Sequence, residues 1–186
     1  MKAIIFDFVG VLAVKSESHV SDDISESIDA KIGSVVDDDK FRTDVMKEYR
    51  ISSKEFDEVI EKIAGKYAPY KPLWDILPAL KSKYKLCIIN NGTAFTLPTF
   101  KKTFQIDDYF DVFLSSAVEG LRKPDPRIYK LAIDRLGVKP NDVLFMDDSL
   151  QNIDAAKGIG IETIYWKTPE EGFGKFINHI DWHSLK

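Results

Sequence analysis

Polar and charged side chains follow four apolar runs of the sequence, each close to the point where a run ends. Asp7 follows the first run, residues 90–92 follow the second, Lys123 lies in the loop after the third, and Asp147 with Asp148 follows the fourth. Carboxylates are hard oxygen ligands that suit Mg²⁺, whereas lysine and amide groups can hold phosphoryl oxygens. A carboxylate beside a metal ion and a lysine can attack phosphorus and form an aspartyl-phosphate. These residue types therefore indicate metal-assisted phosphoryl transfer.

Each of these residues also has an ordinary structural explanation when it is taken alone. An Asp at the end of a strand often caps a turn or a helix, and Asn-Asn-Gly is typical of a turn. A single lysine such as Lys123 is most often a surface residue. Their joint occurrence at the ends of successive predicted strands favours the functional interpretation.

Five short apolar runs must position these residues, and each run is predicted to be a strand. Nearly continuous apolarity over four or five residues is typical of strands that are buried on both faces of a parallel sheet. The predicted strands are residues 3–6, 86–89, 112–114, 143–146 and 163–166.

Helices are predicted between these strands at residues 73–84, 126–136 and 149–157. Pro126 suits the first turn of the second helix, and Gly137 suits its end. Alternating strands and helices predict an α/β fold, with a doubly wound, Rossmann-like parallel sheet as its core. Ligands of such sheets bind at the carboxyl ends of the strands, near the switch in strand order. The candidate residues are therefore expected at one edge of the sheet.

One segment interrupts the alternation. Between Ser16 and Lys71 no strand is predicted, charged residues are dense, and apolar residues have helical spacing. We interpret residues 16–71 as a small all-helical cap inserted after the first strand. Residues 1–15 and 72–186 would then form the core domain.

Two features within the cap suggest helix starts. Ser53 with Glu55 nearby is typical of an N-terminus, although the spacing of a capping box is imperfect. The acidic run at residues 37–39 is expected to lie at a solvated helix N-terminus, where acids complement the helix dipole, rather than to bind a cation.

Composition limits the classes of function. The chain has 186 residues, 44% of them hydrophobic, which is enough for one substantial core. A net charge of -4 argues against broad binding of nucleic acids or anionic membranes. The single cysteine, Cys87, lies in an apolar run and is expected to be buried. No apolar stretch approaches the roughly 20 residues that span a membrane, so a soluble, cytoplasmic protein is expected, and nothing indicates its oligomeric state.

The sequence resembles the haloacid dehalogenase-like hydrolase superfamily. The matching segments are IIFDFVGVL, IINNGT, LRKPDPRIY and VLFMDDSLQNIDAAKGIG, which occur in the order of the family's motifs between residue 4 and residue 160. The insert after the first segment resembles the small helical cap of the phosphatase-like branch. That branch includes sugar-phosphate phosphatases and the amino-terminal domain of soluble epoxide hydrolases.

The resemblance implies a metal site and a nucleophile. Asp7 would be the nucleophile and also a Mg²⁺ ligand. The backbone carbonyl of Val9 and the carboxylate of Asp148 would be further ligands, with Asp147 next to them. The implied activity is that of a phosphatase acting on a small phosphorylated metabolite.

The resemblance also implies a phosphate site. Lys123 would neutralise the phosphate. Asn90 stands where the family usually has a Ser or Thr that binds phosphate, and an amide can still donate a hydrogen bond there. Asn91 and Gly92 would add further donors.

Val9 departs from the family pattern, because this position usually holds an Asp that protonates the leaving group and then activates water. Valine cannot transfer a proton, and loss of general acid–base catalysis typically costs about 10²–10⁴-fold in rate. Activity is therefore expected to be reduced, and least so for activated substrates such as acyl phosphates.

Two other functions stay open. Metal-independent haloacid dehalogenases also lack an acid at this position, but they usually have Tyr there and Ser with Asn in place of the paired acids. A non-catalytic member that binds a phosphorylated ligand or a protein is the other alternative, with Val9 as its main support. Candidate substrate contacts outside the motifs are Lys15, His19 and Arg50, each of which is more typical of the surface.

Overall fold

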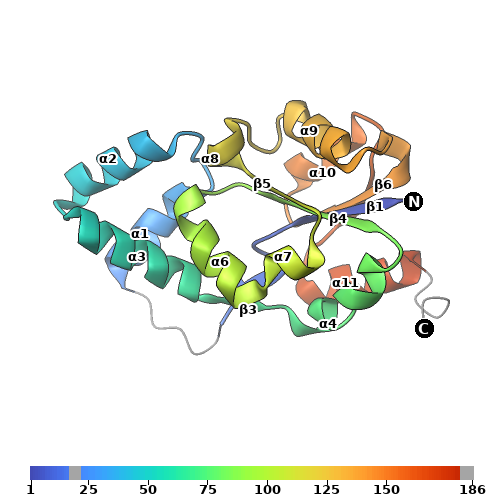
Figure 1. The fold of residues 1–186 in the computed structure, drawn as a ribbon, viewed down its shortest axis with the longest axis horizontal. Helices are drawn as coiled ribbons and strands as arrows, with labels where there is room; N and C mark the ends of the chain where they lie inside the picture. The colour runs from blue at the N-terminus through green and yellow to red at the C-terminus, as the bar shows by residue number, and fades with distance from the viewer. Residues whose placement is uncertain (17–21, 181–186) are drawn as a thin grey trace.

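The computed structural model describes residues 1–16 and 22–180. A five-stranded parallel sheet forms its centre, in the order β5-β4-β1-β6-β7 (Figure 1). Strand β1 lies in the middle, and chain order runs outwards from it on both sides, through β4 to β5 and through β6 to β7. The strands are β1 (Ala3–Asp7), β4 (Lys85–Asn90), β5 (Val112–Ser115), β6 (Val143–Asp147) and β7 (Glu162–Tyr165).

All five predicted strands are present, with boundaries that differ by one or two residues. Four of them extend one residue further, and three of these four end on Asp7, Asn90 and Asp147 themselves. The last strand ends at Tyr165 rather than Trp166. Parallel pairing continues through these polar ends, since Asp7 pairs with Ile89 and Asn90 with Ser115.

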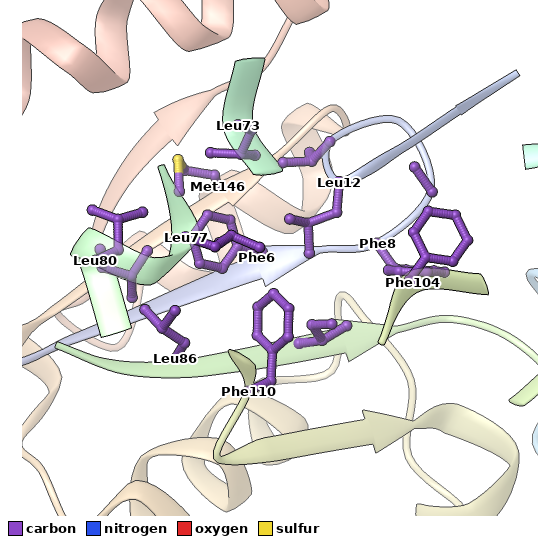
Figure 2. Packing of buried hydrophobic residues seen from close by; sticks show 14 of the residues in the cluster. Phe6, Phe8, Leu12, Leu73, Leu77, Leu80, Leu86, Phe104, Phe110 and Met146 are labelled. Carbon is purple, nitrogen blue, oxygen red and sulfur yellow. The ribbon is translucent and has the colours of Figure 1, made fainter. Parts of the chain in front are cut away.

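Strand β1 is buried on both faces, as the apolar run predicts. Ile4 and Phe6 belong to the core cluster on one face, whereas Ala3 and Ile5 belong to the cluster on the other. Figure 2 shows Phe6 on the first face, beside Leu77 of a covering helix. Cys87 of β4 is also buried, as predicted.

Helices cover both faces of the sheet, so the fold is doubly wound. The core cluster with Ala3 and Ile5 contains residues of α9 (Pro126–Leu136) and α10 (Leu150–Lys157). The cluster with Phe6 contains residues of the helices on the other face: α4 (Lys71–Trp74), α5 (Leu77–Lys81), α6 (Leu97–Phe104), α7 (Ile106–Tyr109) and α11 (Pro169–His179). Three short helices complete the core: η1 (Ala94–Thr96), α8 (Ser116–Glu119) and η2 (Pro140–Asp142).

The helix predicted at residues 126–136 is confirmed, and Gly137 ends it with a φ of 64°. The single helix predicted at residues 73–84 is wrong, because two short helices, α4 and α5, occupy that region. Pro78 explains the break: it lacks the N–H that would donate to residue 74, and its ring clashes with that carbonyl. Proline is tolerated in a first turn, where α5 places it.

Three helices follow the first strand: α1 (Asp23–Ile32), α2 (Asp38–Tyr49) and α3 (Ser53–Gly65). They share a separate apolar cluster and lie beyond the end of β1 that is opposite the N-terminus (Figure 1). The prediction of no strand between Ser16 and Lys71 is wrong, because β3 (Tyr67–Pro69) lies there and pairs antiparallel with β2 (Ala13–Lys15). Three-residue strands are too short to produce a readable alternation. The division into core and cap at residues 16–71 stays a prediction.

Local capping explains where these helices begin. Helix α3 has Ser52 as its N-cap in a capping box with Glu55, so the partner with correct spacing is Ser52 and not Ser53. Asp37 caps α2 and the next two acids lie in its first turn, as the acidic run predicts. Within residues 1–16 and 22–180, no helix is long and apolar enough to cross a membrane.

Candidate active site

The candidate residues lie at the carboxyl ends of the central strands. Asp7 ends β1, Asn90 ends β4 and Asp147 ends β6. Because β1 lies between β4 and β6, these three side chains start from adjacent positions at one edge of the sheet. This edge faces the helices α1 to α3, and it is the switch point of the sheet (Figure 1).

Lys123 joins two of these acids. Its Nζ lies 2.5 Å from Oδ1 of Asp7 and 2.7 Å from Oδ2 of Asp147. The lysine side chain is only 2% exposed, so the three charges form a buried ion triad. Burial favours the neutral lysine, but the two carboxylates outweigh it and raise its pKa above the usual value. Lys123 is therefore a fixed positive charge beside Asp7.

Asn91 positions the loop that carries this lysine. Its side-chain Nδ2 donates to the backbone carbonyl of Lys123 at 2.9 Å, and its Oδ1 accepts from the backbone N–H of Lys123 at 2.8 Å. Asn91 lines the cavity described below, but both of its side-chain polar atoms hold protein backbone. The Asn91 side chain therefore positions the backbone of Lys123, and a contact between Asn91 and the substrate stays a prediction.

Asp147 is fully buried, and both oxygens of its carboxylate accept hydrogen bonds. Oδ1 accepts from the backbone N–H of Ser149 and from Nδ2 of Asn152, at 2.8 and 2.9 Å. Oδ2 accepts from Lys123. Asp147 thus fixes both the lysine and the start of α10.

Asp148 is the more open of the paired acids. No hydrogen bond from another residue of the described chain engages its carboxylate, and burial raises its pKa. Gly10 makes its position possible. Gly10 has a φ of 100°, and a Cβ there would overlap the Asp148 carboxylate. The glycine after Val9 therefore lets this acid approach the loop that follows β1.

The three acids can form a cation site. One carboxylate oxygen from each of Asp7, Asp147 and Asp148 lies within 4.8 Å of the other two. Burial raises the pKa of Asp7 to about 7, Lys123 opposes this, and the neighbouring Asp147 and Asp148 carboxylates add to it. A set of hard oxygen donors with surplus negative charge fits Mg²⁺. Asp7 and Asp148 each have a carboxylate oxygen without a hydrogen bond from another described residue, whereas both oxygens of Asp147 already accept one; all three acids stay candidate ligands.

A cavity of about 260 Å³ opens above these residues. Its core-side lining includes Asp7, Val9, Asn90, Lys123 and Asp148. The cap contributes Asp29, Ile32 and Gly33 of the α1 region, Ile63 of α3 and Tyr67 of β3. The cavity therefore lies between the sheet edge and the helical insert.

The side chain of Asn90 is available to a ligand. It is buried, lines the cavity, and has no side-chain hydrogen bond within the described part of the chain. Gly92 gives it space, since a Cβ at Gly92 would come within 2.6 Å of the Asn90 amide nitrogen. Gly92 itself is not among the lining residues, and its N–H donates to the Ser116 hydroxyl at 2.9 Å. Gly92 therefore makes room for the Asn90 side chain, and its role in binding phosphate stays a prediction.

Several lining residues escaped sequence reasoning. Asn152 lies within the fourth matching segment and could have been identified there, but Asp29, Tyr67 and Phe100 lie outside every motif.

Of the candidate contacts outside the motifs, Lys15 lines an adjoining cavity, which shares Val9 and Asp148 with the first. Arg50 caps the end of α2 and is not among the lining residues of either cavity. His19 lies outside the described residues.

Comparisons with known proteins indicate the family of the chain. The family model for haloacid dehalogenase-like hydrolases matches residues 1–160. An (S)-2-haloacid dehalogenase of Burkholderia cepacia is 36% identical over 96 residues, which cover 51% of this chain and 42% of the relative. A glyceraldehyde 3-phosphate phosphatase of Pyrococcus furiosus is 30% identical over 102 residues, covering 54% and 40%. The chain therefore spans less than half the length of these curated relatives.

The fold is shared with a solved enzyme of the same family. The crystal structure of a Bacteroides thetaiotaomicron family member in complex with magnesium and inorganic phosphate superposes with a TM-score of 0.71. The two proteins are 21% identical, and the match covers 89% of this chain and 93% of that one. This similarity supports the fold.

Proposed function

The chain belongs to the haloacid dehalogenase-like hydrolase family, and on that premise we propose that it is a Mg²⁺-dependent phosphatase. Its substrate would be a small phosphorylated metabolite, and Asp7 would form an aspartyl-phosphate. The observation that carries the proposal is the buried triad of Asp7, Lys123 and Asp147, with the open carboxylate of Asp148 beside it. The similarity to a relative named as a phosphatase supports it.

Asp7, Lys123 and Asn90 would have different roles in phosphoryl transfer. An oxygen of Asp7 attacks phosphorus, the bond to the leaving-group oxygen breaks with its electron pair, and the leaving group takes a proton from water. Water then attacks the same phosphorus and releases inorganic phosphate and Asp7. Lys123 and the Asn90 amide stabilise the phosphoryl oxygens as charge develops on them.

A bound Mg²⁺, held by Asp7, Asp148 and the Val9 carbonyl, would neutralise phosphoryl charge. Asp147 would act by holding Lys123, because its Oδ2 accepts from this lysine and its Oδ1 from the start of α10. Since the Val9 side chain lines the cavity where the family usually has an acid, no proton donor is expected at that position. Acyl phosphates, whose leaving groups need no protonation, should therefore be the fastest substrates.

Two observations bear on alternative functions. A haloacid dehalogenase is among the similar proteins, but the carboxylate of a haloacid would meet three acidic side chains and one lysine at this site. Repulsion between these like charges disfavours binding of a haloacid without a metal ion. A phosphate bound together with a metal ion is the better match, because the cation offsets the negative charge. Val9 supports a non-catalytic, phosphate-binding protein as the second candidate.

Hydrolysis of a panel of phosphorylated metabolites with and without Mg²⁺ tests the proposal. We expect Mg²⁺-dependent phosphate release, with acetyl phosphate as the best substrate and Asp7→Asn as the inactive control. Trapping a metal-fluoride mimic of phosphate on a residue other than Asp7 would refute the assignment of the nucleophile. Mg²⁺ binding without any hydrolysis would favour the non-catalytic alternative.

A further inference from the structure

The cap-side wall of the active-site cavity holds one acid and no free cation among the described residues. Ile32, Ile63 and Tyr67 supply most of this wall, and Asp29 is its ionisable acid. On the core side, the cation Lys123 is committed to Asp7 and Asp147. A substrate that places its phosphate at Lys123 would share this cavity with Asp29.

Asp29 is positioned with one oxygen open. Its Oδ2 accepts from Nζ of Lys66 at 2.5 Å and from the Tyr67 hydroxyl at 3.4 Å. No hydrogen bond from the described chain engages Oδ1, and the side chain is 18% exposed. The supporting Lys66 is only 3% exposed, also pairs with Glu26, and does not line the cavity.

We propose that Asp29 selects the leaving group of the substrate, and that this group is neutral or cationic. A hydroxyl or ammonium group can donate a hydrogen bond to the open Asp29 oxygen. A carboxylate or second phosphate would face a fixed negative charge and apolar side chains. This inference rests on the proposed phosphatase activity and names the substrate class of that site.

The size of the cavity narrows this class further. About 260 Å³ lies below the roughly 300–1,000 Å³ that is typical of sites for drug-sized ligands. The site therefore suits phosphate esters of short alcohols or amino alcohols. Lys15 and Lys167 line only the adjoining cavity, which shares Val9, Tyr67 and Asp148 with the active site. A preference for an anionic leaving group would require a cation from outside the lining, such as one of these lysines or Arg122, which donates to the carbonyl of the lining residue Gly33.

The test compares esters of similar size that differ in charge: phosphoethanolamine, glycerol phosphate and phosphoglycolate, with acetyl phosphate as the reference. For the wild type we expect kcat/KM at least tenfold higher for phosphoethanolamine than for phosphoglycolate, which corresponds to about 1.4 kcal/mol. Asp29→Asn should bring this ratio close to one. A wild-type ratio of one, or a preference for phosphoglycolate, would overturn the inference.

Glu26→Gln is the matched control, because it removes the other acid on Lys66 without changing the lining of the cavity. It should keep the wild-type ratio. If Glu26→Gln changes the ratio as much as Asp29→Asn, the selection comes from the Lys66 network and not from contact with Asp29. If acetyl phosphate is hydrolysed but kcat/KM is the same for phosphoethanolamine and phosphoglycolate, only the leaving-group inference fails. If no ester and no acetyl phosphate is hydrolysed with Mg²⁺, the proposed function fails, and this inference fails with it.

Discussion

The Asn91 side chain forms a two-point pair with the backbone of Lys123, 32 residues further along the chain. This pair connects the loop after β4 to the loop after β5, and it fixes the backbone from which the Lys123 side chain reaches Asp7. A residue that never touches the reacting atoms can therefore control the position of the only lysine in the ion triad.

Asn91→Ala should lower both stability and turnover. The substitution leaves the N–H and C=O of Lys123 without their partners, and an unsatisfied, partly buried polar group costs about 1–3 kcal/mol. Denaturant unfolding would measure this loss. Because a displaced lysine affects the transition state more than ground-state binding, kcat should fall more than KM rises. An unchanged kcat in a folded variant would contradict the positioning role.

Val9→Asp should raise turnover of ordinary phosphomonoesters by about 10²–10⁴-fold, because it restores a proton-transfer group. The gain should be smaller for acetyl phosphate, whose leaving group needs no proton. Steady-state phosphate release would measure both. Val9→Asn is the control, since it has nearly the same size as Asp but cannot transfer a proton. High wild-type turnover of esters with no gain in the aspartate variant would show that the site has another proton donor.

Gly10→Ala should weaken Mg²⁺ binding. The new Cβ would overlap the Asp148 carboxylate, and a φ of 100° is strained for alanine. Titration calorimetry with orthophosphate present would measure the affinity. Gly65→Ala is the matched control, because a Cβ there meets no atom within 4 Å and Gly65 ends helix α3. It should leave Mg²⁺ affinity unchanged and stabilise the fold by about 0.4–1 kcal/mol. Equal affinities in both variants would argue against Asp148 as a ligand.

Lys123→Met should lower the free energy of unfolding by about 3–5 kcal/mol in metal-free buffer, because removing one partner of a buried ion pair leaves uncompensated charge. In this case Asp7 and Asp147 would face each other without their cation. Denaturant unfolding of the variant would be compared with that of Lys130→Met, an exposed lysine on α9. Similar decreases in the free energy of unfolding for the two variants would show that the ion triad does not stabilise the fold more than an exposed lysine does.

Asp125 should make stability depend on acidic pH. Hydrogen bonds from the side chain and backbone N–H of Arg127 lower the pKa of Asp125 to about 2. A group whose pKa is lower in the folded state contributes stability above its unfolded pKa, near 4, and loses it as pH falls towards 2. The stability difference between wild type and Asp125→Asn should therefore be larger at pH 7 than at pH 2. Equal differences at both pH values would refute the pairing with Arg127.

Short, nearly continuous apolar runs predicted the strands of the core sheet, because strands that are buried on both faces carry few polar residues before they end. That same property located Asp7, Asn90 and Asp147. The prediction of secondary structure failed where proline broke a helix or where a strand was too short to show a pattern. Pro78 divided one expected helix into two, and β3 was too short to show a pattern.

The sequence by itself determined the chemistry of the sheet edge: three acids, a lysine and amides at the ends of strands, with Val9 in place of a proton donor. Only the tertiary structure decided which side chains hydrogen-bond to other protein groups and which ones are left to contact a ligand. Asp147 accepts three hydrogen bonds, whereas Asp148 accepts none from another described residue. The Asn91 side chain holds the Lys123 backbone, and Asp29 lines the cavity from the side of α1. The hydrogen bonds of the folded chain determine these roles, and Lys123 bonds to Asp7 although the two residues are 116 positions apart in the sequence. Local sequence cannot encode such partners, because their distance depends on how the whole chain packs.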